Sequence, residues 1–481
     1  MDEPTGQKPP TELELTYQRA NALRMDGRLD EAERTYRSVL SVYPGHANAA
    51  TALAFMLRES GRLNAAADAM FWLWKARAKR IDDSIRTARF LRECDAWDLA
   101  LTVCNEQLRL TPEQPRLLGL AGDFELALGG FEAAATRYRA ALDLDPDIAK
   151  AWLRLVQTCR YERAGDPDIV RLRAASANPA LTEAARLSVA FALGKALDDI
   201  GDYAAAVAAL IPANRAAKQQ YAWSAANWQA VVAARRTAPA LPSSGFDPGF
   251  LPVFIVGLPR SGTTLLATLL DRHADVRSRG ELNWADAFAR HLTANAAGIN
   301  SAATERIARV FAAQLRRDDA PARVYIDKNP LNFRYLDVIA ALFPGARIVH
   351  CRRDRRDVAL SLWSRQFAHA DLAFAYDFAD IAAFADGYAQ LMTHWRDLNV
   401  LPLLDVDYES LVAAPQDELA RVSAFLDLDT TIPDAETGPG NGAISTASVW
   451  QARQPVHTQS VSRWRRYAEQ LPELTALFGQ Q

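Results

Sequence analysis

Residues 251–270, LPVFIVGLPRSGTTLLATLL, decide the fold of the second half of the chain. An apolar, β-branched run over 253–256 ends at Gly257, and Gly262 stands shortly before a helical apolar run over 265–270. A strand, a glycine-bearing turn and a helix in this order are typical of a phosphate-binding loop, because N–H groups at a helix N-terminus point at an anion and glycine lets the backbone approach it. The stretch therefore predicts an α/β domain with a P-loop-like turn and a mainly parallel sheet.

The loop departs from that of nucleotide triphosphatases after its second glycine. Residues 257–262 have the GxxxxG spacing, but Thr263 and Thr264 stand where a lysine and a serine or threonine would follow. Without that lysine, the loop lacks the usual contact to the β- and γ-phosphates of a triphosphate. We expect it to hold a single terminal phosphate-like group, with Arg260, Ser261 and the two threonines as donors.

Two later segments place charged side chains after predicted strands. The strand over 346–351 precedes an arginine-rich helix start, in which Ser361 follows Arg353 by eight positions. The segment 324–330, VYIDKNP, places Lys328 directly after another strand, where ligand sites in open α/β sheets lie. A guanidinium fork suits a phosphate dianion and a hydroxyl adds a neutral donor, whereas an ammonium acts as a point charge.

The other arginines of this helix start have a second interpretation. Arg352, Arg355 and Arg356 fit a solvated basic face as well as they fit a phosphate site. For Arg353 we favour the phosphate site.

Together, these stretches resemble the sulfotransferases, most closely the tyrosylprotein branch, over about 220 residues. PRSGTT at 259–264 resembles the family's 5′-phosphosulfate loop, and Arg353 with Ser361 resembles its 3′-phosphate motif. Members transfer a sulfuryl group from 3′-phosphoadenosine 5′-phosphosulfate to a hydroxyl or amine. The resemblance implies that this compound is the co-substrate, bound by Pro259, Arg260, Ser261, Gly262, Thr263, Thr264, Arg353 and Ser361.

The resemblance also implies the catalytic groups. Lys328 matches a lysine that contacts the bridging and sulfuryl oxygens, so that with Arg260 it would stabilise the leaving phosphate in the transition state. Glu281 matches the glutamate that takes the acceptor's proton, although the family has two consecutive glutamates and this chain has one extra residue before the glycine. A structural salt bridge from Glu281 to Arg277 or Arg279 is the alternative.

Further assignments from the resemblance complete the expected site. Small-molecule sulfotransferases often use a histidine as the base, which keeps His273 and His350 as alternatives. Tyr408 begins a Tyr-Glu-x-Leu segment whose role is nucleotide binding or only the joining of a strand to a helix. Residues 445–455 resemble the loop that closes over the nucleotide, with Arg453 on the 3′-phosphate. No metal-ligand motif occurs, so no metal is expected.

The first half has a different organisation. A turn residue followed by an alanine five positions later recurs every 34 residues, at 27–32, 61–66, 95–100 and 129–134. This is the tetratricopeptide period, in which the turn separates two helices and the small alanine lets them pack closely. The pattern predicts an α-solenoid with repeats over 13–46, 47–80, 81–114 and 115–148, a broken fifth window and an imperfect last repeat near 187–220.

Three parts of the chain are therefore expected. The repeat domain covers 13–220, a proline- and glycine-containing linker covers 221–250, and the sulfotransferase-like domain covers 251–481. The concave face of such repeats usually binds peptides or packs on a neighbour. A peptide or protein acceptor held by the repeats is the expected partner, and the oligomeric state stays open.

Composition excludes several classes of protein. The chain has 481 residues, of which 49% are hydrophobic and 23% charged, as in ordinary globular proteins. A net charge of −3 gives no overall attraction to nucleic acid or anionic lipid. No apolar stretch of about 18 residues and no basic-apolar start occur, so neither a membrane span nor a secretory signal is expected. Four scattered cysteines indicate a reducing compartment, and we expect a cytoplasmic protein.

Lysine usage singles out one residue. Only seven of the 55 basic residues are lysines, and residues 221–481 contain one, Lys328. GC-rich codons explain the general bias. A position that keeps an ammonium against this bias is a candidate for chemistry that a guanidinium cannot perform.

The leading hypothesis is therefore a sulfotransferase that uses 3′-phosphoadenosine 5′-phosphosulfate and acts on a tyrosine in a peptide or protein. A glycan, a lipid or a small metabolite is the alternative acceptor. The competing classes are a P-loop kinase, against which the missing loop lysine argues, and a binding scaffold whose repeats are the working part.

Overall fold

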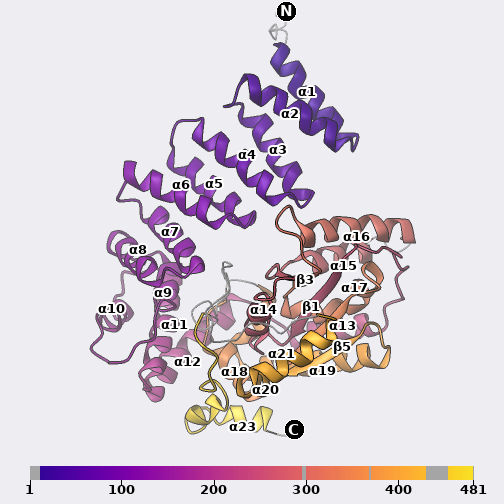
Figure 1. Ribbon diagram of the computed structural model, residues 1–481. Helices are drawn as coiled ribbons and strands as arrows, with labels where there is room; N and C mark the ends of the chain where they lie inside the picture. The colour runs from indigo at the N-terminus through magenta and orange to yellow at the C-terminus, as the bar shows by residue number, and fades with distance from the viewer. Residues whose placement is uncertain (1–10, 295–298, 368–369, 429–452, 480–481) are drawn as a thin grey trace, which may run out of the picture. The chain divides into compact units, whose positions relative to one another are not determined.

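The structure of the chain is a computed structural model that describes residues 11–294, 299–367, 370–428 and 453–479 (Figure 1). The chain forms two compact units. Unit 1 comprises Met1–Phe124 and Arg316–Ala320, and unit 2 comprises Glu125–Leu315 and Pro321–Gln481.

Unit 1 is a stack of paired helices: α1 (Glu12–Met25), α2 (Leu29–Val42), α3 (Ala47–Glu59), α4 (Leu63–Lys75), α5 (Ile81–Glu93), α6 (Trp97–Leu110) and the first part of α7 (Pro115–Leu128). The turns inside the pairs need left-handed backbone, which glycine adopts without cost, and they have φ of 74° at Gly27 and 77° at Gly61. The alanines expected at the helix contacts, Ala32 and Ala66, are fully buried. The predicted α-solenoid is confirmed.

A segment from the second half of the sequence belongs to unit 1. The Asp318 carboxylate accepts hydrogen bonds from the N–H groups of Asn64, at 2.9 Å, and Ala65, at 3.0 Å. It therefore caps the first turn of α4, where N–H groups lack helical partners. Arg317 also forms a 2.8 Å ion pair with Asp95 in the α5–α6 turn. The sequence analysis did not anticipate this contact.

Unit 2 begins with further helices: α8 (Phe131–Leu144), α9 (Ala149–Leu155), α10 (Pro167–Ser176), α11 (Glu183–Asp199), α12 (Tyr203–Gln220) and α13 (Ala225–Arg236). The broken fifth window contains the short α9, followed by non-helical residues before α10. The returning signature forms the turn between α11 and α12, with a φ of 81° at Gly201.

Helix α13 lies inside the stretch expected to be a linker. It packs on α19 (Phe378–Asp397), where the rings of Trp228 and Phe384 stack with centroids 4.7 Å apart. The Trp228 indole N–H also donates to the Phe384 carbonyl oxygen, at 3.2 Å. Residues 225–236 are therefore an integral part of the α/β domain rather than a free connection.

The core of the α/β domain is a five-stranded parallel sheet in the order β2-β3-β1-β4-β5 (Figure 1). Its strands are β1 (Leu251–Gly257), β2 (Val276–Ser278), β3 (Val324–Asp327), β4 (Arg347–Arg352) and β5 (Leu403–Asp407). The chain continues from central β1 to one side of the sheet and later to the other. Ligands bind at the carboxyl edge beside such a switch point.

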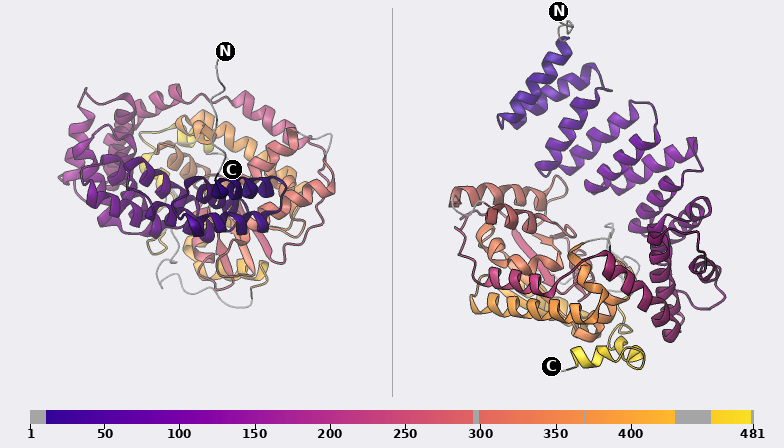
Figure 2. Two further views of the ribbon diagram at one scale, coloured as in Figure 1. Left: turned by 90° about the horizontal axis from the view of Figure 1, so that it is seen from above. Right: turned by 180° about the vertical axis from the view of Figure 1, so that it is seen from behind.

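Helices cover both faces of the sheet (Figure 2). On one face, Phe254 and Ile348 pack with α13, α16, α17 and α19, and on the other, Val253 and Val349 pack with α14 and α21. The helical elements of this domain that are not bounded above are α14 (Thr263–Leu270), α15 (Trp284–Ala294), α16 (Ser301–Arg316), η2 (Pro330–Tyr335), α17 (Leu336–Leu342), α18 (Arg355–Trp363), η3 (Ala370–Tyr376), α20 (Tyr408–Ala413), α21 (Pro415–Phe425), η4 (Arg463–Tyr467) and α23 (Glu473–Phe478). Within the described ranges, no helix has both the length and the apolarity to cross a membrane.

The contact between α13 and α19 yields a stability prediction. A Cβ atom at Gly387 would lie 2.2 Å from the Trp228 indole nitrogen, so Gly387→Ala should lower the free energy of unfolding by about 1–3 kcal/mol through overpacking. Gly345→Ala is the matched control, because a Cβ atom there meets nothing within 4 Å. Thermal and urea unfolding followed by circular dichroism would measure both. Equal stability of the two variants would contradict the packing of α13 described above.

Candidate active site

The phosphate loop joins β1 to α14, and close neighbours leave no room for a side chain at either of its glycines. A Cβ atom at Gly257 would lie 2.4 Å from the Cys351 carbonyl oxygen on neighbouring β4. Gly262 has a φ of 98°, and a Cβ atom there would lie 2.5 Å from Cδ2 of Tyr408. The loop backbone thus lies directly against β4 and the start of α20.

Three sequence stretches meet at this loop. Arg260 takes left-handed backbone with a φ of 75°, and its Nε donates to the Ser361 hydroxyl on α18, at 3.0 Å. Nη1 of Arg353 donates to the carbonyl oxygen of Arg260, at 3.1 Å. The Arg353 guanidinium lies 4.3 Å from the centre of the Tyr408 ring. Residues 260, 353, 361 and 408, predicted from separate segments, therefore form one cluster.

Four guanidinium groups gather around this cluster. Burial, together with the charges of Arg365, Arg353 and Arg463, holds the pKa of Arg260 well below its usual range. Burial and the charge of Arg463 lower the pKa of Arg365 to about 10. Like charges held this close favour the binding of an anion. Neither Arg365 nor Arg463 was predicted from the sequence, although Arg365 stands four residues after Ser361, just beyond the end of α18.

Two buried polar atoms at the loop have no hydrogen-bond partner in the described part of the chain. They are the hydroxyl of Ser261, a residue that is 1% exposed, and Nε of Arg353. Buried polar groups are almost always paired in folded proteins, so such atoms point to a missing ligand. Pro259 and Thr263 are also buried, and Thr264 is half-buried at the uncapped start of α14. These residues fit a bound phosphate-like group.

The two predicted catalytic residues, 47 positions apart in sequence, contact each other. Nζ of Lys328, at the end of β3, forms an ion pair with Oε1 of Glu281. The lysine side chain is 2% exposed and the glutamate side chain 48% exposed. The pair thus presents a solvent-accessible carboxylate beside a buried ammonium.

Residues on either side of Lys328 hold the glutamate segment in place. Asp327 accepts from the N–H of Leu282 at 3.1 Å, and the Asn329 side chain donates to the Leu282 carbonyl oxygen at 3.0 Å. The N–H of Lys328 donates to the Gly280 carbonyl oxygen at 2.9 Å. The sequence analysis missed these positioning roles, because only the fold brings the two segments together.

The alternative role of Glu281 is an ion pair with Arg277 or Arg279. Among the contacts of the described residues, both arginines donate to backbone carbonyl oxygens instead. Arg277 donates to the carbonyl oxygens of Ala274 and Val276, at 2.9 and 2.7 Å. Nε of Arg279 donates to the carbonyl oxygen of Leu315, at 2.6 Å. Glu281 instead pairs with Lys328, the residue expected to act on the same reaction.

The histidine alternatives occupy structural positions. His350 is buried in β4, where Nδ1 lies 2.6 Å from Asp405 and Nε2 contacts the Tyr388 hydroxyl, and burial lowers its pKa. His273 is buried at the end of α14 and accepts from the N–H of Asp275, at 3.0 Å. Both histidine rings are buried, whereas the Glu281 carboxylate is accessible to solvent.

The remaining predicted residues divide into two groups. Arg352, Arg355 and Arg356 pair with Asp407, Asp386 and Asp354 respectively. Arg453 donates to the carbonyl oxygen of Ala127 in the last turn of α7, at 2.7 Å, and its guanidinium lies against Gly129 in the α7–α8 turn. We therefore do not include Arg453 among the residues of the proposed nucleotide site. Residues 445–452 of the expected closing loop lie outside the described residues.

Family models match both halves of the chain. Residues 252–432 match the sulfotransferase family, and residues 13–56 match a tetratricopeptide repeat. The chain therefore carries a tetratricopeptide repeat at its N-terminus and a sulfotransferase domain in its C-terminal half, as predicted.

The chain is also similar to individual proteins. An uncharacterized protein of Aquifex aeolicus is 29% identical over 339 residues, which cover 64% of this chain and 43% of that protein. Protein-tyrosine sulfotransferase 1 of Danio rerio is 25% identical over 241 residues, which cover 44% of this chain and 65% of the relative. The chain thus spans less than two thirds of the length of either relative. A solved sulfotransferase from Mycobacterium tuberculosis H37Rv is 18% identical, with coverage of 66% of this chain and 96% of that chain and a TM-score of 0.26.

The Asp327 carboxylate gives the site a pH-dependent stability. Burial raises its pKa to about 7, whereas an unfolded aspartate titrates near ~3.9. Between these values the native chain binds a proton that the unfolded chain has released, so this contribution to stability is lost as the pH rises through about 7. Asp327→Asn removes the titration. The melting temperature of the variant relative to that of the wild type should therefore rise between pH 5 and pH 8, and a constant difference would contradict the assignment.

Proposed function

We propose that the chain transfers a sulfuryl group from 3′-phosphoadenosine 5′-phosphosulfate to an acceptor hydroxyl. The observation that carries this proposal is the meeting of a phosphate loop that has no triphosphatase lysine with Arg353 and Ser361, in a domain that matches the sulfotransferase family. The absence of the lysine argues for a terminal sulfate rather than a triphosphate.

The donor would be held at two ends. The loop over 259–264 would bind the 5′-phosphosulfate, through N–H groups at the start of α14 and the unpaired Ser261 hydroxyl. Arg353 and Ser361 would bind the 3′-phosphate, for which the fork of Arg353 supplies charge-assisted hydrogen bonds. Ser361 contacts the Arg260 side chain and Arg353 contacts its carbonyl oxygen, so the two ends of the donor site are coupled through one residue of the loop.

In the reaction, Glu281 would take the proton of the acceptor hydroxyl. The acceptor oxygen would attack sulfur in line, forming a new S–O bond while the bond from sulfur to the bridging oxygen of the 5′-phosphate breaks. Lys328 and Arg260 would stabilise the charge that grows on the leaving phosphate. In the free chain the Lys328 ammonium forms an ion pair with Glu281. A bound donor would give this ammonium a second anionic partner, next to the reacting atoms.

The acceptor is proposed to be a tyrosine in a peptide or protein. Several relatives carry the name protein-tyrosine sulfotransferase, and stacks of tetratricopeptide repeats commonly present a concave peptide-binding face. A glycan, lipid or small-metabolite acceptor is the alternative. Mass spectrometry of products formed from cell extract distinguishes them by the modified residue or compound.

Label transfer tests the proposed activity. Purified chain is incubated with donor labelled in its sulfuryl group and with cell extract, and a parallel sample receives γ-labelled ATP. We expect label in acceptor material from the sulfuryl donor alone. Labelling from ATP with none from the sulfuryl donor would favour a kinase instead.

Lys328→Arg should reduce turnover by about 10²- to 10³-fold while changing donor affinity little, because the stabilisation it removes acts mainly in the transition state. The side chain is buried against Glu281, so the larger guanidinium cannot reach the same point. Lys218→Arg, on a half-exposed lysine that pairs with Asp377 and Asp380, is the matched control. Unchanged turnover in Lys328→Arg would exclude the proposed role.

Glu281→Gln should lower turnover by roughly 10²- to 10⁴-fold, because the variant keeps the shape but cannot accept a proton. Binding of 3′-phosphoadenosine 5′-phosphate should persist, since the ion pair that occupies Lys328 is removed. Single-turnover rates and titration calorimetry would separate the two effects. A parallel loss of binding and turnover would assign Glu281 a structural role.

A further inference from the structure

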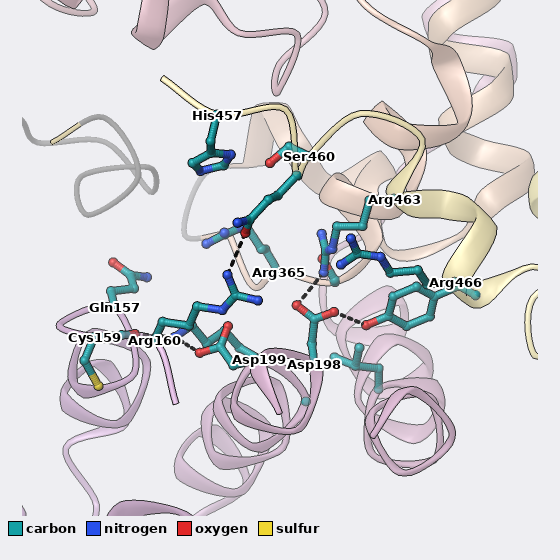
Figure 3. A pocket seen from close by; sticks show the side chains of 16 residues that line it. Gln157, Cys159, Arg160, Asp198, Asp199, Arg365, His457, Ser460, Arg463 and Arg466 are labelled. Atoms are coloured by element: carbon teal, nitrogen blue, oxygen red, sulfur yellow. Dashed lines mark hydrogen bonds and ion pairs between the residues drawn. The ribbon is translucent and has the colours of Figure 1, made fainter. Parts of the chain in front are cut away.

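A cavity of about 120 Å³ lies in unit 2 between the helix array and the last part of the chain (Figure 3). Its walls come from residues 157–160, which follow α9, from α11 and α12, from the residues just after α18, and from 457–467. We call it the α11 pocket. Its volume is large enough to hold a phosphate-sized group.

Cations outnumber anions in the described lining of the α11 pocket. Its cationic side chains are Arg160, Lys195, Arg365, Arg463 and Arg466, and its carboxylates are Asp198 and Asp199. Each carboxylate already has a cation, since Lys195 pairs with Asp199 and Arg463 pairs with Asp198 at 2.6 Å. The lining therefore keeps a positive excess that an anion would balance.

Arg160 contributes part of this excess from the helix array. It follows α9, and its guanidinium donates to the amide oxygen of Gln459, a neutral acceptor, at 2.7 Å. Figure 3 shows Arg160 beside the same space as Arg365 and Ser460. Because this partner is a neutral amide, it does not compensate the charge of Arg160 within the described residues.

The α11 pocket adjoins the residues proposed to bind the 3′-phosphate. The carbonyl oxygen of Ser460, in the pocket wall, accepts from Nη2 of Arg353 at 2.6 Å. Arg365, also in the wall, stands four residues after Ser361. Arg353 thus borders the pocket through Ser460, and Arg365 belongs to the pocket wall itself.

Helices of the array hold this wall in place. The Asn214 side chain on α12 donates to the carbonyl oxygen of Trp363 at 3.0 Å, and the Ser188 hydroxyl on α11 donates to Gln366 at 2.8 Å. Both contacts lie at the end of α18, next to Arg365. The position of the pocket wall thus depends on α11 and α12.

We propose that the 3′-phosphate of the donor enters the α11 pocket and that Arg160, from the helix array, is one of its ligands. The inference rests on the proposed sulfotransferase function. It makes the last helices of the array part of the donor site, in addition to any role in binding an acceptor. It also gives Arg160 a role in discriminating nucleotides that carry a 3′-phosphate from those that lack one.

The test compares Arg160→Ala with Arg163→Ala, an exposed arginine in the same connection that does not line the pocket. Titration calorimetry of the full chain measures binding of 3′-phosphoadenosine 5′-phosphate and of adenosine 5′-monophosphate, which lacks the 3′-phosphate. Arg160→Ala should weaken the first ligand by about tenfold or more, as expected for the loss of a charge-assisted hydrogen bond, and leave the second unchanged. Arg163→Ala should change neither. Equal melting temperatures of the free variants establish that both are folded.

Three outcomes would overturn the inference. Wild-type affinity of Arg160→Ala for 3′-phosphoadenosine 5′-phosphate removes Arg160 from the site. Equal weakening of both ligands assigns Arg160 a general structural role. If the wild-type chain binds neither ligand, the proposed function itself fails, which distinguishes that failure from the first two.

Discussion

The charges of Arg353, Arg365 and Arg463 that act on the buried guanidinium of Arg260 are the constraint on which the site depends. Their mutual repulsion is tolerated because surrounding elements fix each one: a strained loop holds Arg260, the Tyr408 ring supports Arg353, and Asp198 pairs with Arg463. Such an arrangement costs stability in the free chain and lowers the free energy of an anionic complex. The free chain is therefore less stable, and the anion site is already formed before the ligand binds.

Sheet topology brings this charge to the reacting groups. Parallel strands end at one edge, so β1 delivers the phosphate loop, β3 delivers Lys328 and β4 precedes Arg353. The turn after β3 also fixes the segment that carries Glu281, through hydrogen bonds from residues 327–329. The arrangement places a potential base and a potential electrophilic group side by side, as sulfuryl transfer requires.

The sequence predicted what local chemistry determines. The 34-residue spacing of turns and alanines identified the helix pairs, and the glycines at 257 and 262 identified the loop, because close backbone contacts leave no alternative residue there. Contacts between distant segments had no local signal. The docking of Asp318 on α4, the buried Asp327 and the wall formed by α11 depend on the fold, and α13 was hidden within a stretch expected to be a linker. The contact of Arg453 with Ala127 likewise joins distant segments and had no local signal.

Titration calorimetry of the purified chain with 3′-phosphoadenosine 5′-phosphate is a direct test of the donor site, because it requires no knowledge of the acceptor. We expect saturable binding of one ligand per chain, which Mg²⁺–ATP does not displace at comparable concentration. We also expect that binding weakens as salt rises, because the ligand is held largely by charge. Absence of binding, or displacement by ATP at equal concentration, would contradict a site built for the sulfuryl donor.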